Sequence, residues 1–227
     1  MTSILLVWSM LLLITVVHVL GFILFSRLWR IPIQGIGLFF GPPVRSRTWK
    51  GIQFTLNAVP LPSGYVTFVG GDQEECPQPG TFLALPVLVQ ALINLSGPIA
   101  SLGLAALLIG PTRADAEFRS GFLQIFSGMF SLTRARELLG AIDAFARTAP
   151  WWTLLGIAAA KSTALNALPV PNFNGGNAIL ALIRGRKPMP PWMIKIQWFG
   201  FLFLLLFVGM TVIALISLRV SPLRPGP

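Results

Sequence analysis

Residues 15–24 of the chain read TVVHVLGFIL and form part of an apolar run that extends from Ser3 to Phe25. About 20 predominantly apolar residues are enough to cross the hydrocarbon core of a bilayer as an α-helix. His18 is the only ionisable side chain of this run and the only histidine of the sequence. A polar residue at membrane depth is a candidate functional residue. The stretch therefore predicts a membrane helix, residues 3–25, that carries one candidate site residue.

Composition places the whole chain among membrane proteins. Charged residues make up 11% of the sequence, whereas soluble domains carry about 25%. Residues 82–109 and 192–218 are also long enough to span a bilayer. Residues 151–183 are interrupted by proline and glycine, and we interpret them as a broken membrane helix. The first run lacks a basic n-region and a cleavage site, so we expect it to stay in the protein.

The distribution of basic residues argues against a nucleic-acid partner, although the formal net charge is +10. One cluster follows the first span and a second precedes the last span. The two clusters comprise Arg27, Arg30, Arg45, Arg47 and Lys50, and Arg184, Arg186, Lys187 and Lys195. With four crossings both clusters fall on one side. The positive-inside rule then predicts a multi-pass inner (plasma) membrane protein with both termini outside, whose basic residues meet lipid head groups.

The segments between the spans have different patterns. Residues 31–71 are punctuated by glycine and proline and contain β-branched and aromatic stretches, which favours short strands at the membrane surface or partly re-entrant. Residues 72–76, DQEEC, indicate a solvated turn, since they lack the spacing of a calcium loop. Residues 113–149 are expected to form an interfacial segment, in which residues 133–149 repeat apolar side chains at helical spacing between charges and predict an amphipathic interfacial helix. No segment is large enough for a separate globular domain, so residues 1–227 are expected to form one membrane domain.

Three separated stretches share their order and spacing with a known family. They are His18–Phe22 (HVLGF), Val59–Gly70 (VPLPSGYVTFVG) followed by Ser96–Ser101 (SGPIAS), and Leu165–Gly176 (LNALPVPNFNGG). Together they resemble the site-2 protease family of intramembrane zinc metalloproteases. That family carries His-Glu-Leu-Gly-His, a loop of the type Pro-Leu-Gly-Gly-Tyr-Val, Gly-Pro-x-x-Asn and Asn-x-Leu-Pro-x-Pro-x-x-Asp-Gly. The resemblance covers roughly residues 16–182.

The resemblance implies a fold and a set of chemical roles. The expected fold is an all-α polytopic membrane protein of about four transmembrane helices, with a site-2 protease-like core and a small membrane-associated β-hairpin region. In the family, two histidines one helical turn apart and an aspartate hold zinc, and a glutamate acts as general base. Here only His18 keeps its ligand position. The second histidine is replaced by Phe22, the aspartate by Asn174 and the glutamate by Val19. Ser101 stands where the family asparagine lies.

Residues that shape the backbone are retained, in contrast to the chemical groups. They are Gly21, Gly64, Tyr65, Gly97, Pro98, Asn166, Pro169, Pro171, Gly175 and Gly176. We therefore expect no catalytic residues, no metal ligand set and no cofactor. The resemblance implies a groove for a partner or substrate, lined by His18, Gly64, Tyr65, Val66, Gly97, Pro98, Asn166, Asn172 and Asn174.

Several interpretations of these residues stay open. His18 is either a residual metal ligand or a histidine satisfied by a partner such as Asn174. Asn172, Asn174 and Asn177 form either a polar pocket or the hydrogen bonds of the broken helix. Lys161 either snorkels or faces a cavity, and a role in ion passage is a weaker alternative. Residues 59–70 are either a strand edge that pairs with a peptide or a structural hairpin.

The sequence thus predicts a proteolytically inactive, site-2 protease-like membrane protein that binds a membrane segment or a partner subunit in the former substrate groove. One alternative is an active intramembrane metalloprotease with an atypical zinc site. Another is a structural subunit of a larger membrane complex. The expected partners are membrane lipids and a membrane protein.

Overall fold

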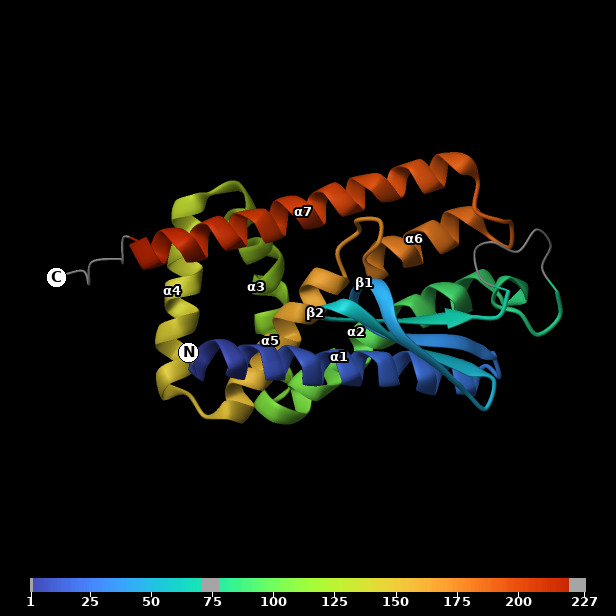
Figure 1. Ribbon diagram of the computed structural model, residues 1–227, viewed down its shortest axis with the longest axis horizontal. Helices are drawn as coiled ribbons and strands as arrows, with labels where there is room; N and C mark the ends of the chain where they lie inside the picture. Colours follow the sequence, from blue (N-terminus) through green and yellow to red (C-terminus); the bar gives the residue numbers. More distant parts are fainter. Residues whose placement is uncertain (1, 71–77, 221–227) are drawn as a thin grey trace.

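The computed structural model describes residues 2–70 and 78–220; the DQEEC cluster therefore lies outside the described residues. The structure is mostly helical with one small sheet (Figure 1). Its elements are α1 (Thr2–Leu28), β1 (Ile33–Trp49), β2 (Ile52–Phe68), the 3-10 helix η1 (Phe82–Ala84), α2 (Val87–Ile109), α3 (Pro111–Phe130), α4 (Leu132–Thr148), α5 (Trp151–Asn166), α6 (Asn174–Arg184) and α7 (Pro191–Val220).

Within residues 2–70 and 78–220, three helices are long and apolar enough to cross a membrane. They are α1, α2 and α7, with mean hydropathies of 2.4, 1.9 and 2.8 in their most apolar windows. The segment expected as a broken third span contains two shorter helices, α5 and α6, which follow one another along the direction of α1 (Figure 1). Pro169 and Pro171 lie between them, and proline neither donates a backbone hydrogen bond nor lets the preceding residue stay helical. The interruption is confirmed, whereas a count of four continuous spans is not.

Small residues allow the helices of the core to approach closely. A Cβ atom built on Gly21 of α1 would lie 2.6 Å from the Ser96 carbonyl oxygen and 2.7 Å from the Ala100 Cβ atom of α2. Likewise, a Cβ atom on Gly156 of α5 would lie 2.6 Å from Ile109 Cγ2 of α2. Such contacts stabilise helix pairs in a bilayer, where lipid tails provide no hydrophobic driving force between helices.

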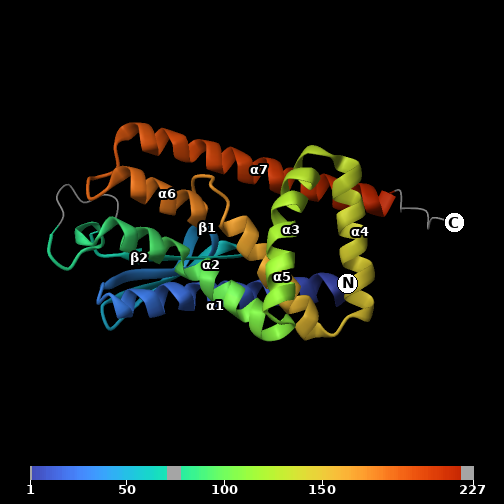
Figure 2. The same cartoon turned by 180° about the vertical axis from the view of Figure 1, so that it is seen from behind.

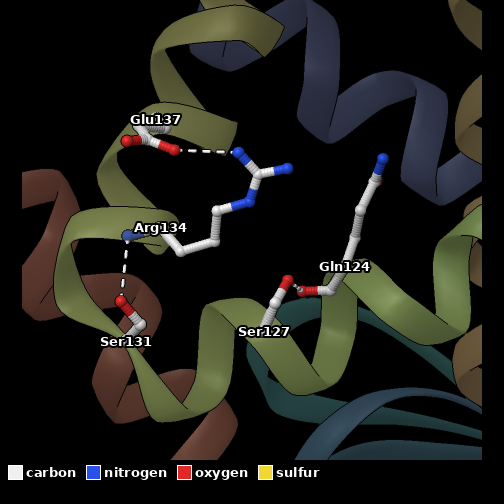
Figure 3. Close-up of polar contacts among 5 residues, drawn as sticks. All are labelled: Gln124, Ser127, Ser131, Arg134 and Glu137. Atoms are coloured by element: carbon white, nitrogen blue, oxygen red, sulfur yellow. Dashed lines mark hydrogen bonds and ion pairs between the residues drawn. The ribbon is translucent and has the colours of Figure 1, made fainter.

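The amphipathic helix expected over residues 133–149 is present as α4, and a second helix, α3, precedes it in the interfacial segment. Both run across the direction of α1 and α7 at one end of the molecule (Figures 1 and 2). Ser131 begins α4 by accepting a hydrogen bond from the backbone N–H of Arg134 at 3.2 Å. The Arg134 guanidinium in turn contacts Glu137 at 2.8 Å (Figure 3). The turn at Ser131 cannot be placed by apolar spacing alone, because α3 and α4 are both amphipathic.

The strands expected in residues 31–71 are present as the antiparallel pair β1 and β2. Residues 33–38 lie between two parts of β2, residues 53–56 and 64–68, while residues 43–49 pair with 52–57. Both strands therefore bend and form a broader sheet than a simple hairpin. The sheet packs along α1 (Figure 1), and Trp8 Nε1 donates a hydrogen bond to the Pro60 carbonyl at 2.7 Å.

Candidate functional site

The His18 side chain lies where α1, α2 and α6 meet. It is hydrogen-bonded to the side chain of Asn174, the first residue of α6. Its ring makes an edge-on contact with Phe22, with the centroids 5.3 Å apart. On the α2 side it rests against the backbone of Gly97, where a built Cβ atom would lie 2.5 Å from His18 Nε2. These contacts favour the interpretation in which His18 is satisfied by a partner, and Asn174 is the partner named there.

Asn174 connects this histidine to the backbone of α2. Its Nδ2 atom donates a hydrogen bond to the Asn94 carbonyl oxygen at 2.9 Å. Asn94 Nδ2 in turn donates to the Gln90 carbonyl at 2.9 Å. The Asn174 amide therefore bridges two elements that are 80 residues apart in sequence, and it fixes the start of α6 beside α1.

The three remaining altered positions are covered by packed side chains or backbone. Val19 is 5% exposed and lies beneath β2, where a Cβ atom on Gly64 would come within 2.7 Å of Val19 Cγ2. Phe22 belongs to a buried cluster with Ile31 and neighbouring apolar residues. Ser101 is 1% exposed, and its hydroxyl has no hydrogen-bond partner among the described residues.

The donor atoms at these positions do not fit a catalytic zinc ion. Such a site needs three protein ligands and an open position for water. Val19 and Phe22 have no lone pairs, and the Asn174 amide already joins His18 to α2. Elsewhere in residues 2–70 and 78–220, no three His, Cys, Asp or Glu side chains gather at one point.

A cavity of about 570 Å³ lies between the sheet and the connection from α5 to α6. Its lining includes Phe40, Ser46, Thr55, Gly64, Tyr65 and Asn172. The backbone of Asn172 is left-handed, with φ of 71°, and its Nδ2 atom donates to the Gln197 carbonyl of α7 at 2.7 Å. Gly64 belongs to both regions, since it lines the cavity and covers Val19.

The residues expected to line one groove therefore occupy different surroundings. His18, Gly97 and Asn174 form the inner contact, whereas Gly64, Tyr65 and Asn172 surround the cavity.

Two further groove candidates contact their own neighbourhoods. Asn166 donates a hydrogen bond to the Ser162 carbonyl within α5 at 2.9 Å, and Val66 packs against the buried cluster of Phe22. Because the Asn172 and Asn174 amides bind different helices, the structure favours the interpretation in which they hold the broken segment together.

Sequence reasoning missed the partner of Lys161. The Lys161 Nζ atom forms an ion pair with Glu117 of α3 at 2.8 Å and donates to the Ser120 hydroxyl. The two charged side chains are only 24% and 26% exposed. Lys161 is the only charged residue in residues 151–183. A single lysine in an apolar segment is the sequence feature that could have indicated a carboxylate partner. Its pairing requires α3 to pack against α5, which local sequence does not reveal.

Comparison with known proteins identifies a family for this arrangement. The family model described as Peptidase family M50 matches residues 6–208. A curated protein of Thermotoga maritima, named "Putative zinc metalloprotease", is 33% identical over 102 residues. That match covers 43% of this chain and 20% of the relative, so the chain matches about one fifth of the length of that protein.

Proposed function

Because the chain belongs to peptidase family M50, the site-2 protease family, we propose that it is a proteolytically inactive member that binds a membrane segment or a partner subunit. The observation that carries the proposal is the environment of His18. Its imidazole is hydrogen-bonded to Asn174 and in edge-on contact with Phe22, where a metal site would need an open coordination position. The Val19 side chain can neither accept nor donate a proton, so it cannot act as the general base.

The surface that supports binding is the cavity beside β2. Tyr65 is 42% exposed there and lies next to the closely packed Gly64. In the described residues, the strand segment 64–68 pairs only with residues 33–38. Its second edge can accept an extended segment of another chain by strand addition, in which the backbone provides affinity and side-chain pockets provide selectivity.

The arrangement of the helices supports a multi-pass location in the inner (plasma) membrane. The start of α1 and the end of α7 lie toward the same end of the molecule (Figure 1). The ends of α1 and α6 and the start of α7 lie at the other end, and this end carries Arg27, Arg184 and Arg186. By the positive-inside rule, that end faces the cytoplasm and the termini face outward.

The first test is the zinc content of the purified, detergent-solubilised protein. We expect the natural chain to carry no stoichiometric zinc, because His18 is the only ligand at its site. A variant with Val19→Glu, Phe22→His and Asn174→Asp restores the family residues and is expected to gain about one zinc per chain. The matched control keeps Val19→Glu and Asn174→Asp but carries Phe22→Leu, and it should stay free of stoichiometric zinc.

Stoichiometric zinc in the natural chain, or cleavage that a chelator abolishes, would overturn the proposal in favour of an active metalloprotease.

The proposed binding of a membrane segment or partner subunit needs a separate test. A photo-crosslinking amino acid at Tyr65 should capture a membrane protein more strongly than the same group at exposed Trp198 of α7. A partner that also co-purifies in equal amount would favour a permanent subunit of a complex over a transient ligand.

A further inference from the structure

The turn between β1 and β2 carries a surface that the proposed function does not use. We call residues 43–57 the basic hairpin. Within it, Arg45 pairs with Leu56, Arg47 with Phe54 and Trp49 with Ile52 across the two strands. Residues 43–50 are exposed, and Trp49 is 60% exposed. The Lys50 Nζ atom lies 5.1 Å from the centroid of the Trp49 ring, within the range of a cation–π contact.

The alternation of a β-strand divides these side chains between two faces. Successive side chains point to opposite sides of the sheet, and directly paired residues share a side. One face therefore carries Arg45, Arg47, Trp49, Ile52, Phe54 and Leu56. The opposite face carries Ser46, Thr48, Gln53 and Thr55, and Ser46 and Thr55 are within 3.4 Å of each other. The hairpin thus has one cationic, aromatic and aliphatic face and one neutral polar face.

The two faces have different surroundings. Ser46, Gln53 and Thr55 line the cavity that contains Tyr65 and Asn172. Arg45, Arg47 and Trp49 do not line this cavity, and the alternation of the strand directs them to the other side. The surface with Arg45 and Arg47 is therefore available to a partner different from the one that enters the cavity.

Charge and position identify the kind of partner. No acidic residue occurs before Asp72, so residues 1–71 offer no carboxylate to neutralise Arg45, Arg47 and Lys50. The turn of the hairpin lies toward the end of the molecule where α1 ends and α7 begins (Figures 1 and 2). This end of the spans is the level of a membrane surface. Arginine or lysine beside tryptophan and phenylalanine is the combination that favours the lipid headgroup region.

We infer that the cationic face of the basic hairpin docks on the surface of a bilayer that contains anionic phospholipids. The arginine and lysine side chains bind lipid phosphates, and Trp49, Phe54 and Leu56 enter the boundary between headgroups and acyl chains. Docking holds one side of the sheet against the membrane and leaves the polar side facing the cavity. The inference requires the family's membrane location but not the absence of proteolysis, so it stands or fails separately from the proposed function.

Hydrogen–deuterium exchange of the full chain in lipid nanodiscs tests this surface. Each cation near an anionic bilayer increases partitioning by about fivefold. Exchange of peptides covering residues 43–57 should therefore be slower by about tenfold or more in discs with phosphatidylglycerol than in discs of phosphatidylcholine alone. Raising the salt concentration toward 1 M, where the screening length is about 3 Å, should remove most of this difference in the natural chain.

Three variants separate charge from structure. Arg45→Gln, Arg47→Gln and Lys50→Gln together should abolish the difference between the two kinds of disc. Arg45→Lys, Arg47→Lys and Lys50→Arg together keep the charge and should retain most of it. Removal of three cations from α3 and α4, by Arg113→Gln, Arg119→Gln and Arg147→Gln, should leave hairpin exchange as in the natural chain, because α3 and α4 lie toward the opposite end of the molecule (Figure 1).

Equal exchange in both kinds of disc would overturn the inference, as would a difference that persists in the neutralised variant. A third outcome would assign the surface to an acidic protein instead of lipid. In that case an acidic peptide such as polyglutamate would protect residues 43–57 in neutral discs, while anionic lipid would give no protection. The salt dependence of the natural chain decides the question even if the neutralised variant fails to fold.

Discussion

The His18 imidazole rests against the Cα atom of Gly97, which leaves no room for a side chain at that position. A Cβ atom on Gly97 would lie 2.5 Å from His18 Nε2 and 2.6 Å from His18 Cδ2. Gly97, the glycine of the family motif on α2, therefore makes room for His18, the motif histidine on α1. The helix backbone and this polar side chain therefore depend on each other.

This contact predicts a different outcome for two glycines of the same helix. Gly97→Ala should push His18 away from α2 and loosen its link to Asn174. A Cβ atom on Gly103 of α2 would have no atom within 4 Å. Gly103→Ala should therefore stabilise the helix through the higher helix propensity of alanine. The two variants are expected to differ by about 1–3 kcal/mol in stability, because overpacking a tight contact costs about that much. Thermal unfolding in detergent measures the difference, and equal melting temperatures would contradict the contact.

The His18–Asn174 hydrogen bond should appear as a coupling in a double-mutant cycle. We expect His18→Ala and Asn174→Ala to be non-additive by roughly 0.5–2 kcal/mol, since side-chain hydrogen bonds between membrane helices contribute about that amount. Asn166→Ala is the matched control, because the Asn166 side chain bonds within α5. Reversible unfolding in mixed detergents provides the free energies. Coupling between His18 and Asn166 as large as that with Asn174 would assign the effect to general loosening of the bundle.

The ion pair between Lys161 and Glu117 should stabilise the contact of α5 with α3. Lys161→Met leaves the Glu117 carboxylate with no lysine partner in a partly buried place, so we expect a loss of about 1–2 kcal/mol. Adding Glu117→Gln to Lys161→Met removes the unpaired charge and should recover much of that loss. Arg119→Met, which breaks the exposed pair with Asp115, should cost less than about 1 kcal/mol. Unfolding curves of the four proteins at one pH test this order.

The Ser101 hydroxyl is expected to contribute nothing to stability. It is buried without a hydrogen-bond partner among the described residues, so Ser101→Ala should be neutral or stabilising by up to about 1 kcal/mol. Ser96→Ala is the comparison on the same helix, because Ser96 Oγ donates to the Ile93 carbonyl at 2.6 Å. We expect Ser96→Ala to be less stable than Ser101→Ala by about 1 kcal/mol. A large loss for Ser101→Ala would show that its hydroxyl has an important partner.

The sequence was sufficient for the features that depend on local chain chemistry. The apolar run around His18 marked α1, and Pro169 with Pro171 placed the interruption between α5 and α6, because proline prevents a continuous helix wherever it occurs. Glycine and β-branched residues in 31–71 indicated strands. The order of four short motifs was enough for the family, which the match to residues 6–208 confirms.

The sequence was insufficient where two distant segments decide the environment of a side chain. Lys161 was assigned to the membrane surface or a cavity because its partner, Glu117, belongs to a helix whose packing direction is not encoded locally. The helix α3, which precedes the amphipathic helix expected over residues 133–149, was missed for a related reason. Both helices are amphipathic, and only their contacts with α5 and α7 fix where the turn between them lies.

The amino-acid sequence by itself determined that this chain is a membrane protein of the site-2 protease family, and it predicts which motif positions differ. Only the tertiary structure decided how those positions are used. It places Gly64 over Val19, joins Asn174 to both His18 and Asn94, and leaves the Ser101 hydroxyl without a partner in the described part of the chain. The reason is that composition and short-range spacing set membrane insertion and backbone shape, whereas hydrogen bonds and close packing at membrane depth require atoms from helices and strands far apart in sequence.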